Sequence, residues 1–237
     1  MTVIRVLLCL WVLVLTFSAL SAPAQFFRVR PLPPVPGQIS SAANDLNDLG
    51  EIVGNSGPHA VVWRSFSPIP LHRAPTPSAA MAINNLGVIV GHADRYPHIW
   101  FPDGSVVPAC EGSRGVAQHI TDDGLILGYW ARSFVASCQG GCNRIFLLFR
   151  GVLSFPFPDQ EILGNGINHL GSFVVGKDAS LAVYNGEELI PLRPPAGFSH
   201  ASGFAINGAG DVVGEASDQE RSLSRPVVWR AGESANP

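Results

Sequence analysis

The stretch Leu46-Asn47-Asp48-Leu49-Gly50-Glu51-Ile52-Val53-Gly54 is one of five similar stretches that decide the fold. The other four have their turn residues at Asn84, Thr121, Asn168 and Asn207. Each stretch places an apolar residue before the turn residue, Gly three positions after it, and then an apolar run that ends in Gly. Successive turn residues lie 37, 37, 47 and 39 positions apart. The chain is therefore an array of five repeats.

Each repeat predicts four short strands. In Asn-x-x-Gly, the Asn side chain bonds back to the backbone and Gly takes a positive φ angle without steric cost, so this turn joins the first strand to the second. An apolar run that ends in an aromatic residue, such as Ala60–Trp63, predicts the third strand, and the Pro-bearing run Ile69–Leu71 predicts the fourth. Four strands in about 40 residues are typical of a propeller blade. We expect an all-β, five-bladed β-propeller, with a β-solenoid of unusually long coils as the alternative.

The two ends of the array are complementary. The segment before the first repeat resembles the fourth strand of blade four, at Glu188–Gly197, and the last repeat ends after its third strand, at Trp229. We therefore expect Phe27–Leu32 to complete the fifth blade as its fourth strand. Such a closure removes the exposed strand edges that favour aggregation.

The composition agrees with a packed chain of short strands. Of the 237 residues, 46% are hydrophobic and only 14% are charged, whereas about 25% charged residues are usual in soluble domains. The 25 Gly and 20 Pro residues leave little room for long helices. The formal net charge of −3 and the absence of a basic block exclude an electrostatic surface for nucleic acid.

The N-terminus has the order of a secretory signal peptide. Arg5 precedes the apolar run Val6–Leu20, and the small residues of Ser21–Ala24 follow it. We expect cleavage after Ala24, which leaves residues 25–237 as a single domain with no membrane span. The predicted location is secreted or periplasmic.

The repeat pattern resembles the HAF repeat family of predicted extracellular bacterial proteins. The similarity is clearest from Asn47 through Trp63 and from Asn207 through Trp229. The departures are Thr121, an extra residue before Gly176, and an insertion of residues 129–144 in blade three. The resemblance implies secretion and a propeller-like fold, and it provides no catalytic residues.

Three cysteines follow the leader, at Cys110, Cys138 and Cys142. In an oxidising compartment they are disulfide candidates before they are metal ligands. The spacing favours a small loop closed by Cys138 and Cys142, and Cys110 is the alternative partner for either. Zinc would need a fourth ligand that the sequence does not nominate, so we predict no metal and no cofactor.

Four residues are candidates for a binding site. Asp45 and His119 lie two positions before their turn residues, where the other repeats have small residues: Ala82, Gly166 and Ala205. They are expected either to face the central channel or to bond with water or the neighbouring backbone. Trp130 and Phe134 lie in the insertion, where an exposed aromatic contact is expected because loops that break a repeat often carry function.

The sequence contains none of the common enzymatic motifs: no G-x-S-x-G elbow, H-E-x-x-H pair, P-loop or Rossmann glycine pattern. We therefore expect a monomeric binding or interaction module for an extracellular ligand, either a glycan or a protein surface. A propeller hydrolase or lyase that acts on a polysaccharide is one alternative. A purely structural envelope protein is the other.

Overall fold

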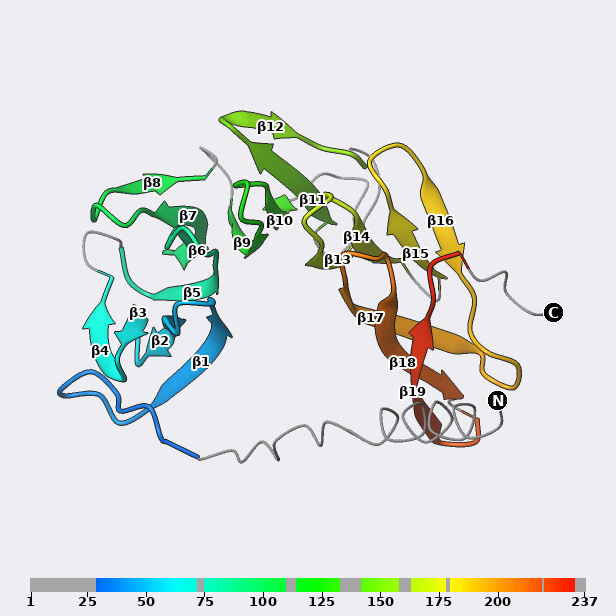
Figure 1. Ribbon diagram of the computed structural model, residues 1–237, viewed down its shortest axis with the longest axis horizontal. Helices are drawn as coiled ribbons and strands as arrows, with labels where there is room; N and C mark the ends of the chain where they lie inside the picture. The colour runs from blue at the N-terminus through cyan, green and yellow to red at the C-terminus, as the bar shows by residue number, and fades with distance from the viewer. Residues whose placement is uncertain are drawn as a thin grey trace, which may run out of the picture. The chain divides into compact units, whose positions relative to one another are not determined.

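The computed structural model describes residues 29–71, 75–109, 114–132, 142–157, 163–177, 180–218 and 220–232. The chain divides into two units, residues 1–31 and 32–237, and all the strands belong to the second. The described residues form 19 strands in five small antiparallel sheets and no helix (Figure 1). The prediction of an all-β fold is confirmed. Within these ranges no apolar helix is long enough to span a membrane.

Each sheet is built from one repeat, with its strands hydrogen-bonded in chain order. The first sheet contains β1 (Ser41–Leu46), β2 (Ile52–Ser56), β3 (His59–Arg64) and β4 (Ser67–Pro70). The second contains β5 (Ser78–Ile83), β6 (Ile89–Ala93), β7 (Tyr96–Trp100) and β8 (Val106–Pro108). The third contains β9 (Arg114–Ile120), β10 (Ile126–Arg132), β11 (Cys142–Phe149) and β12 (Val152–Ser154). The fourth contains β13 (Leu163–Ile167), β14 (Phe173–Lys177), β15 (Ser180–Tyr184) and β16 (Leu189–Leu192), and the fifth contains β17 (His200–Ile206), β18 (Val212–Asp218) and β19 (Leu223–Trp229).

The turn between β5 and β6 shows why the repeats fold in this way. The Asn84 Oδ1 atom accepts hydrogen bonds from the backbone N–H groups of Leu86, at 3.1 Å, and Val88, at 2.9 Å. Gly87 has a φ angle of 76°, which a residue with a side chain rarely adopts. The Asn-x-x-Gly motif therefore forms the tight turn that the sequence predicts.

The core consists of layers between consecutive sheets. We call the face of each sheet that packs against the next sheet its leading face, and the opposite face its trailing face. Val53 and Val62, on the leading face of the first sheet, pack against Ile83 and Ile89, on the trailing face of the second sheet. The later sheets repeat this arrangement: Val90 and Ile99 pack on Ile126, Leu127 on Phe173, and Val174 and Val183 on Ile206 and Val212. Each layer buries apolar surface, which is the main stabilising term of such a fold. The sheets therefore stabilise one another in chain order.

Two predicted features differ from the structure, and other predictions fall on residues that the structure does not describe. The fifth sheet has three strands, and Val29–Leu32, the described part of the expected fourth strand, has no strand conformation. The ends of the insertion 129–144 continue β10 and begin β11, so these residues extend the hairpin of the third sheet. Phe27, residues 1–24 with their predicted cleavage site, and residues 133–141 lie outside the described residues.

Candidate functional site

Asp45 lies near the end of β1, opposite Val53 of β2. The side chain is half-buried, and its Oδ2 atom accepts a hydrogen bond of 2.9 Å from the backbone N–H of Ile83, in the first strand of the second sheet. Within the described part of the chain this is the one hydrogen bond that the carboxylate makes. Asp45 thus links two sheets and keeps acceptor capacity for another group.

His119 holds the same position in the third sheet, in β9 opposite Leu127. Its Nε2 atom accepts a hydrogen bond of 3.2 Å from the backbone N–H of Gly166, in the first strand of the fourth sheet. A neutral imidazole that accepts at Nε2 carries its proton on Nδ1. Burial lowers the pKa of His119, and the negative charge of Asp45 opposes this shift only in part. The imidazole is therefore a neutral hydrogen-bond donor at pH 7.

The negative charge of Asp45 favours the protonated form of His119, although the two residues lie in the first and third sheets. An ionised carboxylate can accept a proton, and a neutral Nδ1–H can donate a hydrogen bond to an oxygen atom on which negative charge develops. The pair therefore provides two functions that acid–base chemistry requires. The bonds to neighbouring backbone, which the sequence left open as an alternative, are also present, so both side chains tie one sheet to the next.

Trp130 lies in β10 rather than in a surface loop, because the strand extends into the predicted insertion. The indole ring stacks on Phe155, with the ring centroids 5.2 Å apart, and it packs against the core between the second and third sheets. The indole Nε1 atom is buried and has no hydrogen-bond partner among the described residues. Trp130 is thus a packing residue in this structure. Phe134 lies outside the described residues.

The cysteine predictions fall on residues whose side chains the structure does not describe. Cys110 and Cys138 lie outside the described ranges, and Cys142 is placed only as the first backbone residue of β11. The described residues contain no group of three or more His, Cys, Asp or Glu side chains that could hold a metal ion.

His92, in β6, is a residue that the sequence analysis did not single out. Its Nδ1 atom is buried without a hydrogen-bond partner among the described residues, and burial followed by the nearby charge of His98 lowers the pKa of His92. The ring lines a pocket of about 290 Å³ together with Arg95 and Arg114. The position after the second-strand Gly varies among the repeats, so the sequence carried no signal for this residue.

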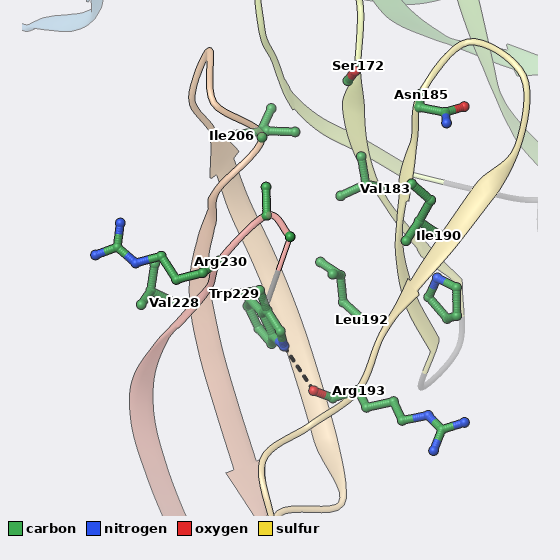
Figure 2. A pocket seen from close by; sticks show the side chains of 14 residues that line it. Ser172, Val183, Asn185, Ile190, Leu192, Arg193, Ile206, Val228, Trp229 and Arg230 are labelled. Carbon is green, nitrogen blue, oxygen red and sulfur yellow. Dashed lines mark hydrogen bonds between the residues drawn. The ribbon is translucent and has the colours of Figure 1, made fainter. Parts of the chain in front are cut away.

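A larger pocket, of about 550 Å³, lies between the fourth and fifth sheets. Figure 2 shows Trp229 inside it, with its Nε1 atom donating a hydrogen bond of 2.9 Å to the carbonyl oxygen of Arg193. The corresponding groove between the second and third sheets measures only about 260 Å³, and it has Phe101 where the larger pocket has Asn185. Neither Asp45 nor His119 lines the larger pocket.

Comparisons with known proteins give little beyond these observations. No family model matches the chain, and no curated protein matches it either. One solved structure is similar, a gluconolactonase from Xanthomonas campestris described as important in glucose secondary metabolic pathways, at 13% sequence identity and a TM-score of 0.46. The match covers 87% of this chain and 91% of the other. That structure is an enzyme and not a binding module, so the expectation of a binding module is not supported and is withdrawn. A likeness this weak carries no argument about the activity, the substrate or the site residues of this chain.

Proposed function

We propose that this protein is a polysaccharide-cleaving enzyme, a hydrolase or a lyase, in which Asp45 is the base and His119 is the hydrogen-bond donor. One observation carries the proposal. A carboxylate and a partly buried, neutral imidazole occupy the same position of the first strand in two different sheets. The remaining sheets have small residues at this position, namely Ala82, Gly166 and Ala205.

The chemistry of a lyase uses both groups. Asp45 accepts the proton from the carbon next to the carboxyl group of a uronic acid unit. The electron pair of that C–H bond forms a double bond to the neighbouring carbon, whose bond to the leaving glycosidic oxygen breaks. That oxygen then takes the proton from Asp45, and the Nδ1–H of His119 stabilises the negative charge that collects on the carboxyl group. In a hydrolase, Asp45 takes the proton of the attacking water instead. The water oxygen bonds to the anomeric carbon while the bond from that carbon to the leaving glycosidic oxygen breaks, and the leaving oxygen then takes the proton from Asp45.

The proposal includes an architecture and a location. The five sheets are the five blades of a propeller, in agreement with the five turn motifs of the sequence. Membership of the HAF repeat family, secretion after loss of residues 1–24 and a disulfide between Cys138 and Cys142 are parts of the same proposal. They rest on the sequence patterns alone.

The test is to incubate the full chain with neutral and uronate-containing polysaccharides. Release of reducing ends reports cleavage of either kind, and the ultraviolet absorbance of unsaturated ends identifies a lyase. We expect Asp45→Asn and His119→Gln each to lower the rate by about 100-fold or more, the usual contribution of a positioned acid or base. Asp94→Asn is the matched control, since Asp94 is an exposed turn residue between β6 and β7.

Two results would overturn the proposal. One is a chain that releases no ends from any of these polymers. The other is a pair of variants, Asp45→Asn and His119→Gln, that cleave as fast as the natural chain but melt at a lower temperature. The second result would mean that the two residues only tie the sheets together through their bonds to the backbone.

A further inference from the structure

The leading face of the fifth sheet is exposed, although every other leading face is covered. Val213 and Val228 are 49% and 48% exposed. Their counterparts Val53 and Val62, which pair in the same way in the first sheet, are buried. The residue type and the repeat position are the same, and the difference in exposure arises because none of the described sheets packs against this face of the fifth.

The trailing face of the first sheet is exposed in a complementary way. Leu46, the residue before the turn Asn, is 67% exposed. Its counterparts Ile83 and Ile206, in the second and fifth sheets, are buried under the leading face of the preceding sheet. In the part of the chain that the structure describes, one leading face and one trailing face are thus left without a partner.

The turn asparagines give an independent argument. The Nδ2 atoms of Asn47, Asn84 and Asn168 each donate a hydrogen bond of 3.0–3.2 Å to the carbonyl oxygen of the turn residue in the next sheet. All three side chains are buried. Among the described residues, Asn207 of the fifth sheet donates only to Asp211, the equivalent of the bond that Asn47 makes to Glu51 in addition to its bond to the next sheet, and Asn207 is exposed. The other three Asn side chains each donate to the turn residue of the next sheet. If the first sheet follows the fifth in the same way, the acceptor for Asn207 is the carbonyl oxygen of Asn47.

The connection that precedes the first sheet adds a third argument. The Nε1 atom of Trp63 donates to the carbonyl oxygen of Pro33, at 2.8 Å, just as Trp229 of the fifth sheet donates to that of Arg193, at 2.9 Å. Gly37 and Gly197, four residues after these carbonyls, have φ angles of 88° and 87°. The segment before the first sheet therefore has the conformation of a link between two sheets, as if another sheet preceded it.

We propose that the leading face of the fifth sheet packs against the trailing face of the first sheet of the same chain. Val213 and Val228 then cover Leu46, and Asn207 bonds to Asn47. An intramolecular partner is favoured over a second copy because linked sheets meet at a high effective concentration. A head-to-tail contact between copies would instead build rings of several copies or open filaments. The proposal stands whether or not the chain is an enzyme.

This closure would also complete the surroundings of the polar pair. The Nδ2 atoms of Asn44 and Asn165 donate to the carbonyl oxygens of Ala80 and Gly203, each in the first strand of the next sheet. Phe204 is the fifth sheet's counterpart of these two asparagines and is exposed. In the closed arrangement its ring lies on the first strand of the first sheet, the strand that carries Asp45.

Disulfide trapping tests the closure in the full chain. We expect Leu46→Cys with Val213→Cys to form a bond within one chain under mild oxidation, with peptide mapping to identify the two introduced thiols and size-exclusion chromatography to show a monomer. Leu86→Cys with Val213→Cys is the matched control, because Leu86 is also 67% exposed but lies at a turn of the second sheet. The control pair should remain unlinked within a chain.

Several results would overturn the proposal. They are a link between the introduced thiols of two different chains, no link at all, or equal linking in the control pair. If the double variant does not fold, the single variant Val213→Cys decides the matter. Its thiol should react with a soluble alkylating reagent at least about 10-fold more slowly than that of Leu86→Cys if the first sheet covers it, and equally fast if the face is open.

Discussion

Replacement of Asn84 by Ala should destabilise the fold far more than its single side chain suggests. The side chain accepts hydrogen bonds from Leu86 and Val88 and donates one to Thr121, at distances of 2.9–3.1 Å. Each such bond contributes about 1 kcal/mol, so their joint loss lowers the free energy of unfolding by about 3 kcal/mol. The site is buried, so the partners left behind cannot all bond with water.

Urea unfolding followed by tryptophan fluorescence measures this change. The midpoint should fall while the slope with urea concentration stays the same, which shows that stability and not compactness has changed. For a chain of this size the loss corresponds to a melting temperature lower by about 6–12 °C.

Asn185→Ala is the matched control for this experiment. The Asn185 Oδ1 atom also accepts two turn bonds, from Glu187 and Glu188, but the residue is exposed and makes no bond to the next sheet. Its replacement should cost about 1 kcal/mol or less. A cost below about 1 kcal/mol for Asn84→Ala, or equal costs at the two sites, would refute the idea that the turn asparagines join the sheets.

Two further predictions concern pH and backbone packing. Burial lowers the pKa of His119, so the unfolded chain binds more protons than the folded chain below about pH 6.5. The free energy of unfolding should therefore fall as the pH drops below that value. In urea titrations, His119→Gln should make this pH dependence weaker. An unchanged slope in the variant would contradict the neutral state assigned to His119. Gly128→Ala should lower the free energy of unfolding by about 1–3 kcal/mol in the same assay, because a Cβ there overlaps the Phe146 ring and the Val116 carbonyl. Gly176→Ala should leave it almost unchanged, because its Cβ meets open space. Equal stability of the two variants would mean that the strands at Gly128 are not packed as described.

Much of the fold was predictable because the repeats combine a turn motif with strand patterns. Asn84 and Gly87 specify the tight turn by themselves, and the branched residues after them form a strand that is buried on both faces. The five sheets follow from five copies of this signal. The strand bounds around Trp130 did not follow, because a loss of repeat similarity predicts a loop, whereas β10 continues through Trp130 to Arg132 and β11 already begins at Cys142.

The candidate site was only partly predictable. The unusual polar residues Asp45 and His119 stand out against small residues in the alignment of repeats. Their hydrogen bonds to Ile83 and Gly166, and the protonation state that follows for His119, depend on how one sheet approaches the next. No local sequence pattern encodes how closely two neighbouring sheets approach each other. His92 was missed for the same reason, since its burial is set by the neighbouring sheet.

The packing of each sheet on the next, and of the fifth on the first, is tested most directly by comparing Val53→Ala with Val213→Ala. Val53 is buried, so the loss of two methyl groups should lower the free energy of unfolding by about 2 kcal/mol. If the fifth sheet packs against the first, Val213→Ala should lower the free energy of unfolding by the same amount. The dependence of that free energy on urea concentration should stay the same. A cost of about 0.5 kcal/mol or less would show that this face stays open to solvent and would contradict the closure.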